Sequence, residues 1–156
     1  FLITDLANRR FGPATARLVV FTGFIIAVAL SVWLATPRIA VASGSAFLLA
    51  QLLDVSVFDR LRNKVWWLPP LVSTIIGSSL DTVIFFGLAF SQAANIIGPG
   101  DAFATEAAPL LGIFAAEAPR WVSWALGDLA VKLIVGLSML LPYGVLMPVL
   151  APQTRA

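Results

Sequence analysis

The sequence predicts an all-α fold, a polytopic bundle of transmembrane helices, from its composition, its apolar runs and the residues that end those runs. Of the 156 residues, 60% are hydrophobic and only 12% are charged, and the mean hydropathy is +0.95. A soluble domain carries about 25% charged and about 45–50% apolar residues. The chain has too few polar residues to cover a water-facing surface, so we expect it to face lipid.

Four apolar runs are long enough to cross a bilayer, which takes about 20 mainly apolar residues. They lie at about 15–36, 39–59, 69–91 and 120–146. Pro69 and Pro70 suit the start of a helix, where a missing N–H costs nothing. Pro142 is expected to kink the last span or to end its regular part. We therefore expect residues 1–156 to form a single transmembrane domain.

The segment 92–119 differs from the spans. It contains Gly98-Pro99-Gly100 and three acids, and its apolar stretch from Ala102 to Ala116 is short for a span. We expect an extracytoplasmic loop that contains a helix lying at the membrane interface.

Basic residues set the expected orientation, because cytoplasmic loops of membrane proteins are enriched in Lys and Arg. Only Arg38 and Arg120 lie on one side, near the acids of the long loop. The other side carries Arg9, Arg10, Arg17, Arg60, Arg62, Lys64 and Arg155. We expect the 60–64 connection and the C-terminus to lie in the cytoplasm, in a multi-pass protein of the bacterial inner membrane.

Several classes of protein are excluded by what the composition lacks. The chain has no cysteine and no histidine, so disulfides, thiolate catalysis, a Ser-His-Asp triad and ordinary zinc sites are absent. A scattered net charge of +2 does not suit a nucleic-acid partner. We expect no catalytic residues, cofactor or metal, and we expect membrane lipid and a small molecule as partners.

Polar side chains inside the spans point to a substrate site. A charge near the bilayer centre costs about 2.5–3.5 kcal/mol and normally faces a cavity or a partner. At 1.5 Å per residue, Asp128 lies about 12 Å and Lys132 about 18 Å below the outer boundary, and Asp81 lies about 18 Å above the inner one. Gln51 lies at a similar depth on the second span, and Asp54 lies about one turn nearer the cytoplasm. One shared site explains all of them most economically.

Each polar group shares a helix face with aromatic residues, at spacings of three or four. The three faces are Trp121, Trp124, Asp128 and Lys132; Thr74, Ser78, Asp81 and Phe85; and Phe47, Gln51, Asp54 and Phe58. Rings stack on a flat heterocycle, while carboxylates and amides bind its N–H and C=O edge. A carboxylate suits a guanine-like edge, which offers two adjacent donors.

Structural explanations compete with this hypothesis. Asp128 and Lys132 form an i, i+4 pair and could simply neutralise each other, whereas Asp81 has no cationic neighbour on its own helix. Tryptophans near the interfaces often anchor helices, and the small residues at 43–46 and 77–79 suit close helix packing. The basic residues at 60–64 could serve only as topology determinants.

Several motifs, taken together, resemble the VUT family of queuosine precursor transporters. They are Thr4–Gly12 (TDLANRRFG) with Ala16-Arg17, Ala50–Arg62 (AQLLDVSVFDRLR), Trp66-Trp67, Ser73–Thr82 (STIIGSSLDT), Asp128 with Lys132, and Leu141–Leu146 (LPYGVL). The resemblance covers nearly the whole chain. Two departures are Ser78, where many members are expected to have Asn, and a longer loop at 92–119.

The resemblance implies a bundle of about six helices, with one whole helix and most of another ahead of Phe1. It also implies import of deazapurine bases such as 7-cyano-7-deazaguanine. The expected substrate-site residues are Gln51, Asp54, Asp81, Asp128, Lys132, Trp124, Ser78, Asp5 and Asn8. In this site Lys132 would hold Asp128 ionised or exchange partners with it.

Other functions remain open from the sequence. A substrate-capturing subunit would need a separate energising complex. An intramembrane aspartyl protease would need Asp81 and Asp128 to share a proton, but the known motif type is Gly-x-Gly-Asp and Asp128 is preceded by Ala125-Leu126-Gly127. A purely structural membrane subunit has little need of acids at mid-membrane. The sequence also leaves open whether the protein forms a homo-oligomer.

Overall fold

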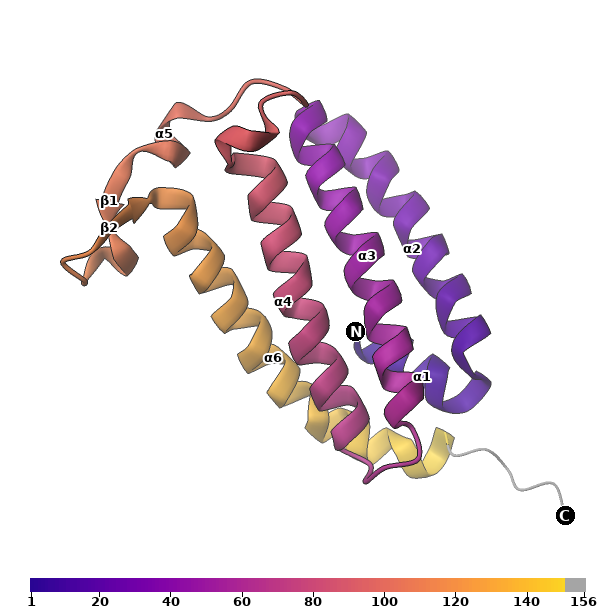
Figure 1. Ribbon diagram of the computed structural model, residues 1–156. Coiled ribbons are helices and arrows are strands. Elements are labelled where there is room, and N and C mark those ends of the chain that lie inside the picture. Colours follow the sequence, from indigo (N-terminus) through magenta and orange to yellow (C-terminus); the bar gives the residue numbers. More distant parts are fainter. Residues whose placement is uncertain (151–156) are drawn as a thin grey trace, which may run out of the picture.

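The computed structural model describes residues 1–150, with side chains to residue 148, so Arg155 lies outside the described residues. Four long helices dominate it (Figure 1). They are α2 (Pro13–Leu34), α3 (Pro37–Leu61), α4 (Leu68–Phe90) and α6 (Arg120–Leu150). All four are long and apolar enough to cross a membrane, which confirms the prediction of an all-α, polytopic bundle.

Proline marks the start of three of these helices. Pro13 and Pro37 lie at the first turns of α2 and α3, and α4 begins just before Pro69-Pro70. The first N–H groups of a helix have no partner within it, so proline loses no hydrogen bond there. The observed ends accordingly lie close to the predicted ones.

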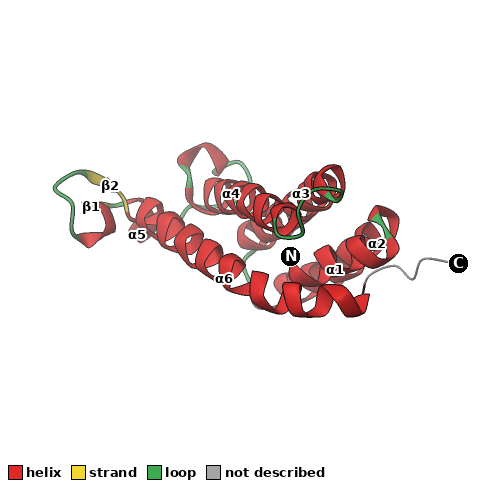
Figure 2. Cartoon of the chain, turned by 90° about the horizontal axis from the view of Figure 1, so that it is seen from below, coloured by secondary structure: helices red, strands yellow, loops and turns green. Residues whose placement is uncertain are grey.

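The long helices follow one another in a curved row, with chain neighbours antiparallel and α2 and α6 at its ends (Figure 2). A shorter helix, α1 (Leu2–Phe11), lies inside the curve and contacts α2, α3 and α6. Gly12 allows the sharp turn from α1 to α2 because its φ of 89° lies in the left-handed region, which glycine enters without a steric penalty. The first residues of α1 therefore lie among the other helices.

The segment between α4 and α6 differs from what its composition predicted. It contains a 3-10 turn, η1 (Gln92–Ala94), a four-residue helix, α5 (Ala102–Thr105), and an antiparallel hairpin of β1 (Ala107–Pro109) and β2 (Glu117–Pro119) around η2 (Leu110–Gly112). The expected interfacial helix is thus reduced to α5. Asp101 caps α5 through its carboxylate, and Pro109 cannot continue a helix because it lacks an N–H.

Two prolines lie inside α6 without ending it. The helix runs through Pro142 and Pro148 to Leu150. Its C-terminal part, drawn in yellow, turns away from the direction of the first part (Figure 1). This matches the expected kink, because a proline removes one backbone hydrogen bond and crowds the preceding turn.

Apolar and polar residues are distributed as in a membrane protein. The outer helices α2 and α6 expose many large apolar side chains, among them Phe21, Ile25, Trp33, Ile134 and Leu141. Most of the fully or nearly buried polar side chains among the described residues lie on α1, α3 and α4 instead, and they include Asp5, Asn8, Gln51, Asp54, Ser73 and Ser78. The inside of the curve is therefore the place to look for a site.

Candidate functional site

One polar cluster joins α4 to α6. The Lys132 ammonium donates to Asp81 Oδ2 at 2.6 Å and also to Asp128 Oδ2. Thr82 Oγ1 donates to Asp128 Oδ2 at 2.8 Å and lies 3.3 Å from the ammonium. The structure thus brings together three of the predicted site residues, and Asp81 finds on α6 the cationic partner that its own helix lacks.

The cluster is only partly enclosed. The side chains of Lys132, Asp81 and Asp128 are 28%, 23% and 33% exposed. In these contacts each carboxylate uses Oδ2, so each Oδ1 lies outside the hydrogen bonds of the cluster. Two carboxylates also share one ammonium, which leaves one formal negative charge. The cluster can therefore accept hydrogen bonds from a further group with N–H donors.

Lys132 sits between the two acids, and this bears on the protease alternative. An aspartyl protease needs two carboxylates that share one proton directly. Here Asp81 and Asp128 both bind the same ammonium group instead. This arrangement holds a charge in place and does not suit proton sharing between the two acids.

A cavity of ≈ 340 Å³ lies beside the cluster, between α1, α4 and α6. Its polar lining includes Asp5, Thr74, Ser78, Lys132 and Tyr143, and its apolar lining includes Val131, Val135, Met139 and Leu140. Ligand pockets typically have volumes of about 300–1,000 Å³, mostly apolar walls and a few placed polar groups. The cavity is therefore of the right size for one small heterocycle.

A second polar group lies behind this cavity, where α1 meets α3 and α4. Asp5 is 2% exposed, and Asn8 and Asp54 are fully buried. Thr4 Oγ1 donates to Gln51 Oε1 at 3.3 Å. Of the predicted site residues, Asp5, Ser78 and Lys132 line the cavity. Asp81 and Asp128 lie beside it as partners of Lys132, and Gln51, Asp54 and Asn8 belong to the second group, so the structure divides the predicted single site into two groups.

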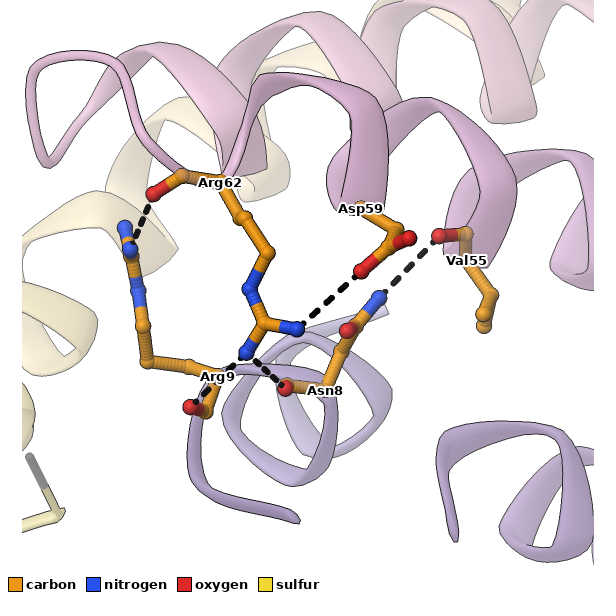
Figure 3. A network of polar contacts seen from close by, with 5 residues as sticks. All are labelled: Asn8, Arg9, Val55, Asp59 and Arg62. Carbon is orange, nitrogen blue, oxygen red and sulfur yellow. Dashed lines mark hydrogen bonds and ion pairs between the residues drawn. The ribbon is translucent and has the colours of Figure 1, made fainter. Parts of the chain in front are cut away.

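Asn8 also belongs to a network that ties α1 to the end of α3 (Figure 3). Its side-chain amide donates to the Val55 carbonyl at 3.0 Å. The Arg62 guanidinium donates to the Asn8 and Arg9 carbonyls at 3.0 and 3.3 Å and pairs with Asp59 at 3.1 Å. The Asn8 carbonyl also accepts from the Gly12 N–H at 2.9 Å, whereas the Arg9 carbonyl faces Pro13, which has no N–H to donate. Arg62 is thus a cap for α1, beyond the topology role expected of it.

Arg9 extends the same network toward α6. It donates to the Arg62 carbonyl and, at 3.0 Å, to the Tyr143 hydroxyl. Tyr143 packs edge-on against Phe58, with ring centroids 6.4 Å apart. Tyr143 is fully buried and lines the cavity. The sequence named Tyr143 only within the LPYGVL motif, and nothing in the spacing alone indicated its partner.

Trp124 lies one turn before Asp128 on α6 and packs among aromatic rings. Its ring centroid is 5.8 Å from that of Phe90 and 6.2 Å from that of Phe103, beside the hairpin. The sequence predicted that Trp124 shares a site with Gln51 and Asp54, but in the structure it packs against Phe90 and Phe103. The reason is that α6 contacts α4 but diverges from α3, so the outer end of α6 faces the segment 91–119.

Sequence reasoning did not identify Arg38 as a residue with a structural role. It is 3% exposed and donates to the carbonyls of Leu88, Ser91 and Gly98 and to Asn95 Oδ1, at 2.6–3.1 Å. It thereby caps the end of α4 and fixes the start of the loop. Its position just after Pro37 suggested only a charge at the membrane boundary.

The fold and the buried polar groups define a multi-pass membrane protein with a small-molecule cavity. A sequence model of the family described as "Putative vitamin uptake transporter" matches residues 1–147. The chain belongs to this family.

Curated relatives support the assignment. The chain is 36% identical over 172 aligned residues to the queuosine precursor transporter of Escherichia coli (strain K12), covering 96% of this chain and 69% of the relative. It is 34% identical to the probable queuosine precursor transporter of Haemophilus influenzae, covering 96% of this chain and 65% of that protein. The relative from Bacillus subtilis, also named a probable queuosine precursor transporter, is 30% identical over 118 residues, covering 58% of this chain and 52% of that protein. The chain thus spans about two thirds of the first two relatives. No solved structure matches it.

Proposed function

We propose that this chain is the greater part of a bacterial inner-membrane transporter that imports queuosine precursor bases of the 7-deazaguanine type, such as 7-cyano-7-deazaguanine. The relatives are named for queuosine precursors. The observation that carries the proposal is the Asp81–Lys132–Asp128 cluster, which reaches through Lys132 onto a cavity sized for one heterocycle.

The chemistry of the cavity suits a guanine-like base. Such a base offers two adjacent N–H donors on one edge, and a carboxylate accepts both at once. It also offers a carbonyl oxygen, to which an ammonium donates. Lys132 lines the cavity, and Asp81 and Asp128 lie next to it as the partners of its ammonium, so a base that approaches Lys132 would come near both carboxylates while the apolar walls contact its ring faces. Ser78 and Thr74 on α4 line the same space and contribute hydroxyl groups.

Lys132 gives the site a means of responding to the substrate. An unpaired charge inside the membrane is costly, so the ammonium always needs a carboxylate partner. A base that engages one carboxylate leaves the other as the partner of Lys132. Asp81 lies on α4, whereas Asp128 and Lys132 lie on α6. The carboxylate that Lys132 keeps as its partner therefore decides whether this ion pair joins the two helices. Substrate binding is thereby linked to the packing of the helices that border the cavity.

The test is uptake of labelled 7-cyano-7-deazaguanine by cells that cannot synthesise it. The full-length protein is compared with its Asp81→Asn and Asp128→Asn variants at equal membrane abundance. Loss of a hydrogen bond to a charged group costs about 1.5–3 kcal/mol, or about 10–100-fold in affinity. We expect uptake by the wild type and a loss of that order in both variants.

Asp101→Asn is the matched control, because asparagine caps a helix as well as aspartate does and Asp101 lies outside the membrane helices. Normal uptake by both Asp81→Asn and Asp128→Asn would refute the proposed site. No uptake by a well-expressed wild type would refute the substrate or would require a separate energising complex.

A further inference from the structure

Five buried side-chain oxygen atoms on α1, α3 and α4 form no hydrogen bond of acceptable distance and angle among the described residues, although the Asp54 carboxyl lies close to the Asp5 carboxyl and the Ser73 hydroxyl. They are Asp5 Oδ1, Asn8 Oδ1, Asp54 Oδ1, Asp54 Oδ2 and Ser78 Oγ. Such atoms are rare in folded proteins, because a buried polar atom without a partner is costly. Asp5 and Asp54, which carry three of these atoms, lie against each other, so a ligand bound here would find oxygen atoms free to engage it.

The charges at this place are unbalanced. The carboxylates of Asp5 and Asp54 lie close enough to repel each other, and both are at least 98% buried. No cationic side chain among the described residues donates a hydrogen bond to Asp54. Two adjacent buried carboxylates are unfavourable unless a positive charge lies between them.

The cationic and titratable groups that face the pair already have other partners. Arg9 on α1 donates to Tyr143 and to the Arg62 carbonyl. Lys132 on α6 shares the cavity with Asp5 but is bound by Asp81 and Asp128. The α-amino group of Phe1 also acts on both carboxylates. A peptide bond ahead of Phe1 would remove that charge.

We propose that Asp5 and Asp54 bind a small cation, either a proton or Na⁺, whose movement drives import. The coupling rests on the proposed transport function, whereas the cation site does not. Hard cations prefer oxygen ligands, and carboxylate, amide and hydroxyl oxygens are the groups left open here. Residue Asp5 lines the substrate cavity as well, so the cation would lie directly behind the base.

The contacts of α1 explain how binding of the cation and binding of the base would be linked. Asp5 and Asp54 lie on different helices, and α1 is held to α3 at its other end by Arg62 and Asn8. A cation between the acids draws α1 toward α3, and its release lets them separate. Because α1 forms one wall of the cavity, the cation and the base each favour a particular position of this helix. Such differential binding is what coupling between two sites requires.

Cation binding is measured first, on purified full-length protein and without any base. One measurement is the binding of ²²Na⁺. The other is an infrared titration that follows the band of a protonated carboxylic acid. We expect one of the two signals in the wild type, and we expect it to fall by about tenfold or more in Asp54→Asn and in Asp5→Asn. Asp101→Asn should retain it. No signal by either method, or a signal that both variants retain, would overturn the proposal.

Coupling is measured next, in liposomes that contain the same proteins. With a sodium or proton gradient, the wild type should accumulate labelled 7-cyano-7-deazaguanine, whereas Asp54→Asn should only exchange it across the membrane. Loss of exchange in Asp54→Asn would show that Asp54 binds the base and would overturn the coupling role. A wild type that binds the cation but neither exchanges nor accumulates the base would refute the proposed substrate and leave the cation site standing.

Discussion

Lys132 illustrates how one side chain can organise a site inside a membrane. It is the common partner of Asp81 and Asp128, which lie on different helices. Thr82 donates to the same oxygen of Asp128 that the ammonium binds. The ammonium therefore fixes both acids in position, and the loss of this one side chain would leave two carboxylates without a cationic partner in the cluster.

We predict that Lys132→Met destabilises the protein and reduces uptake of the base. An exposed ion pair contributes about 0–1 kcal/mol, and breaking a buried one costs about 3–5 kcal/mol. For this partly exposed cluster we expect a loss of about 1–3 kcal/mol, measured as a shift in thermal unfolding in detergent. Lys64→Met is the control, since Lys64 is exposed between α3 and α4. Equal unfolding temperatures for both variants would show that the cluster does not stabilise the folded protein.

At the residue scale, sequence reasoning identified the charged groups and the Asp128–Lys132 pair, but not the partner of Asp81. The cost of membrane charges made Asp81, Asp128 and Lys132 candidates, and the structure brings them together. Spacing along one helix cannot reveal a contact between helices, so the bond from Lys132 to Asp81 was not foreseen. For the same reason Arg38 and Arg62 looked like boundary charges, although both cap helix ends.

The close packing of α4 on α6 depends on a small residue at their contact. A Cβ at Gly136 would lie 2.6 Å from Thr74 Cγ2, too close for any real contact. Threonine is β-branched and is restricted to two χ1 rotamers within a helix, so Thr74 has few ways to move its methyl group aside. Small residues at helix contacts commonly allow such approach in membranes.

We predict that Gly136→Ala pushes α4 and α6 apart and costs about 1–3 kcal/mol, as overpacking typically does. Gly127→Ala is the control on the same helix, because nothing lies within 4 Å of its added Cβ. That variant should be neutral or slightly stabilised, since alanine favours a helix more than glycine does. Thermal unfolding and uptake are measured for both. Similar behaviour of the two variants would contradict this account of the contact.

The loop between α4 and α6 depends on Arg38 at the start of α3. We predict that Arg38→Met exposes residues 91–100 to proteases and speeds their amide hydrogen exchange, because three hydrogen bonds to this region and one to the Leu88 carbonyl of α4 are lost. Arg60→Met, near the other end of the same helix and exposed, should leave that exchange unchanged. Unaltered exchange in Arg38→Met would show that other contacts hold the loop.

At the element scale, the helices were more predictable than the loop. Long apolar runs bounded by Pro13, Pro37 and Pro69 identify membrane helices by length alone. The run 102–116 is apolar but short, and periodicity cannot separate a short helix from a hairpin. Ala108 pairs with Ala118 across the connection that contains η2. No pattern of neighbouring residues indicates this pairing, so the hairpin was not predicted.

At the scale of the whole molecule, the charges predict a single orientation. The 60–64 connection carries Arg60, Arg62 and Lys64, and the opposite end carries acids of the segment 92–119. Basic connections stay in the cytoplasm. The hairpin should therefore face the other side, where Phe103, Arg120 and Trp124 line an open depression beside it.

The orientation is testable by labelling, because the chain has no cysteine of its own. We predict that a membrane-impermeant thiol reagent labels Ile113→Cys in intact cells, since Ile113 is 80% exposed in the hairpin. Lys64→Cys should be labelled only after the membrane is opened. The reverse pattern would invert the orientation and place the hairpin in the cytoplasm.

The central claim is that this fold moves a 7-deazaguanine base through the site held by Lys132. The most direct measurement is exchange of labelled 7-cyano-7-deazaguanine across liposomes that contain only the purified full-length protein. We predict saturable exchange by the wild type, and exchange lower by about tenfold or more in Asp81→Asn, for the loss of one charged hydrogen-bond partner. Equal exchange by wild type and variant would contradict the proposed site. No exchange by the folded wild type would contradict transport of this base by the protein alone.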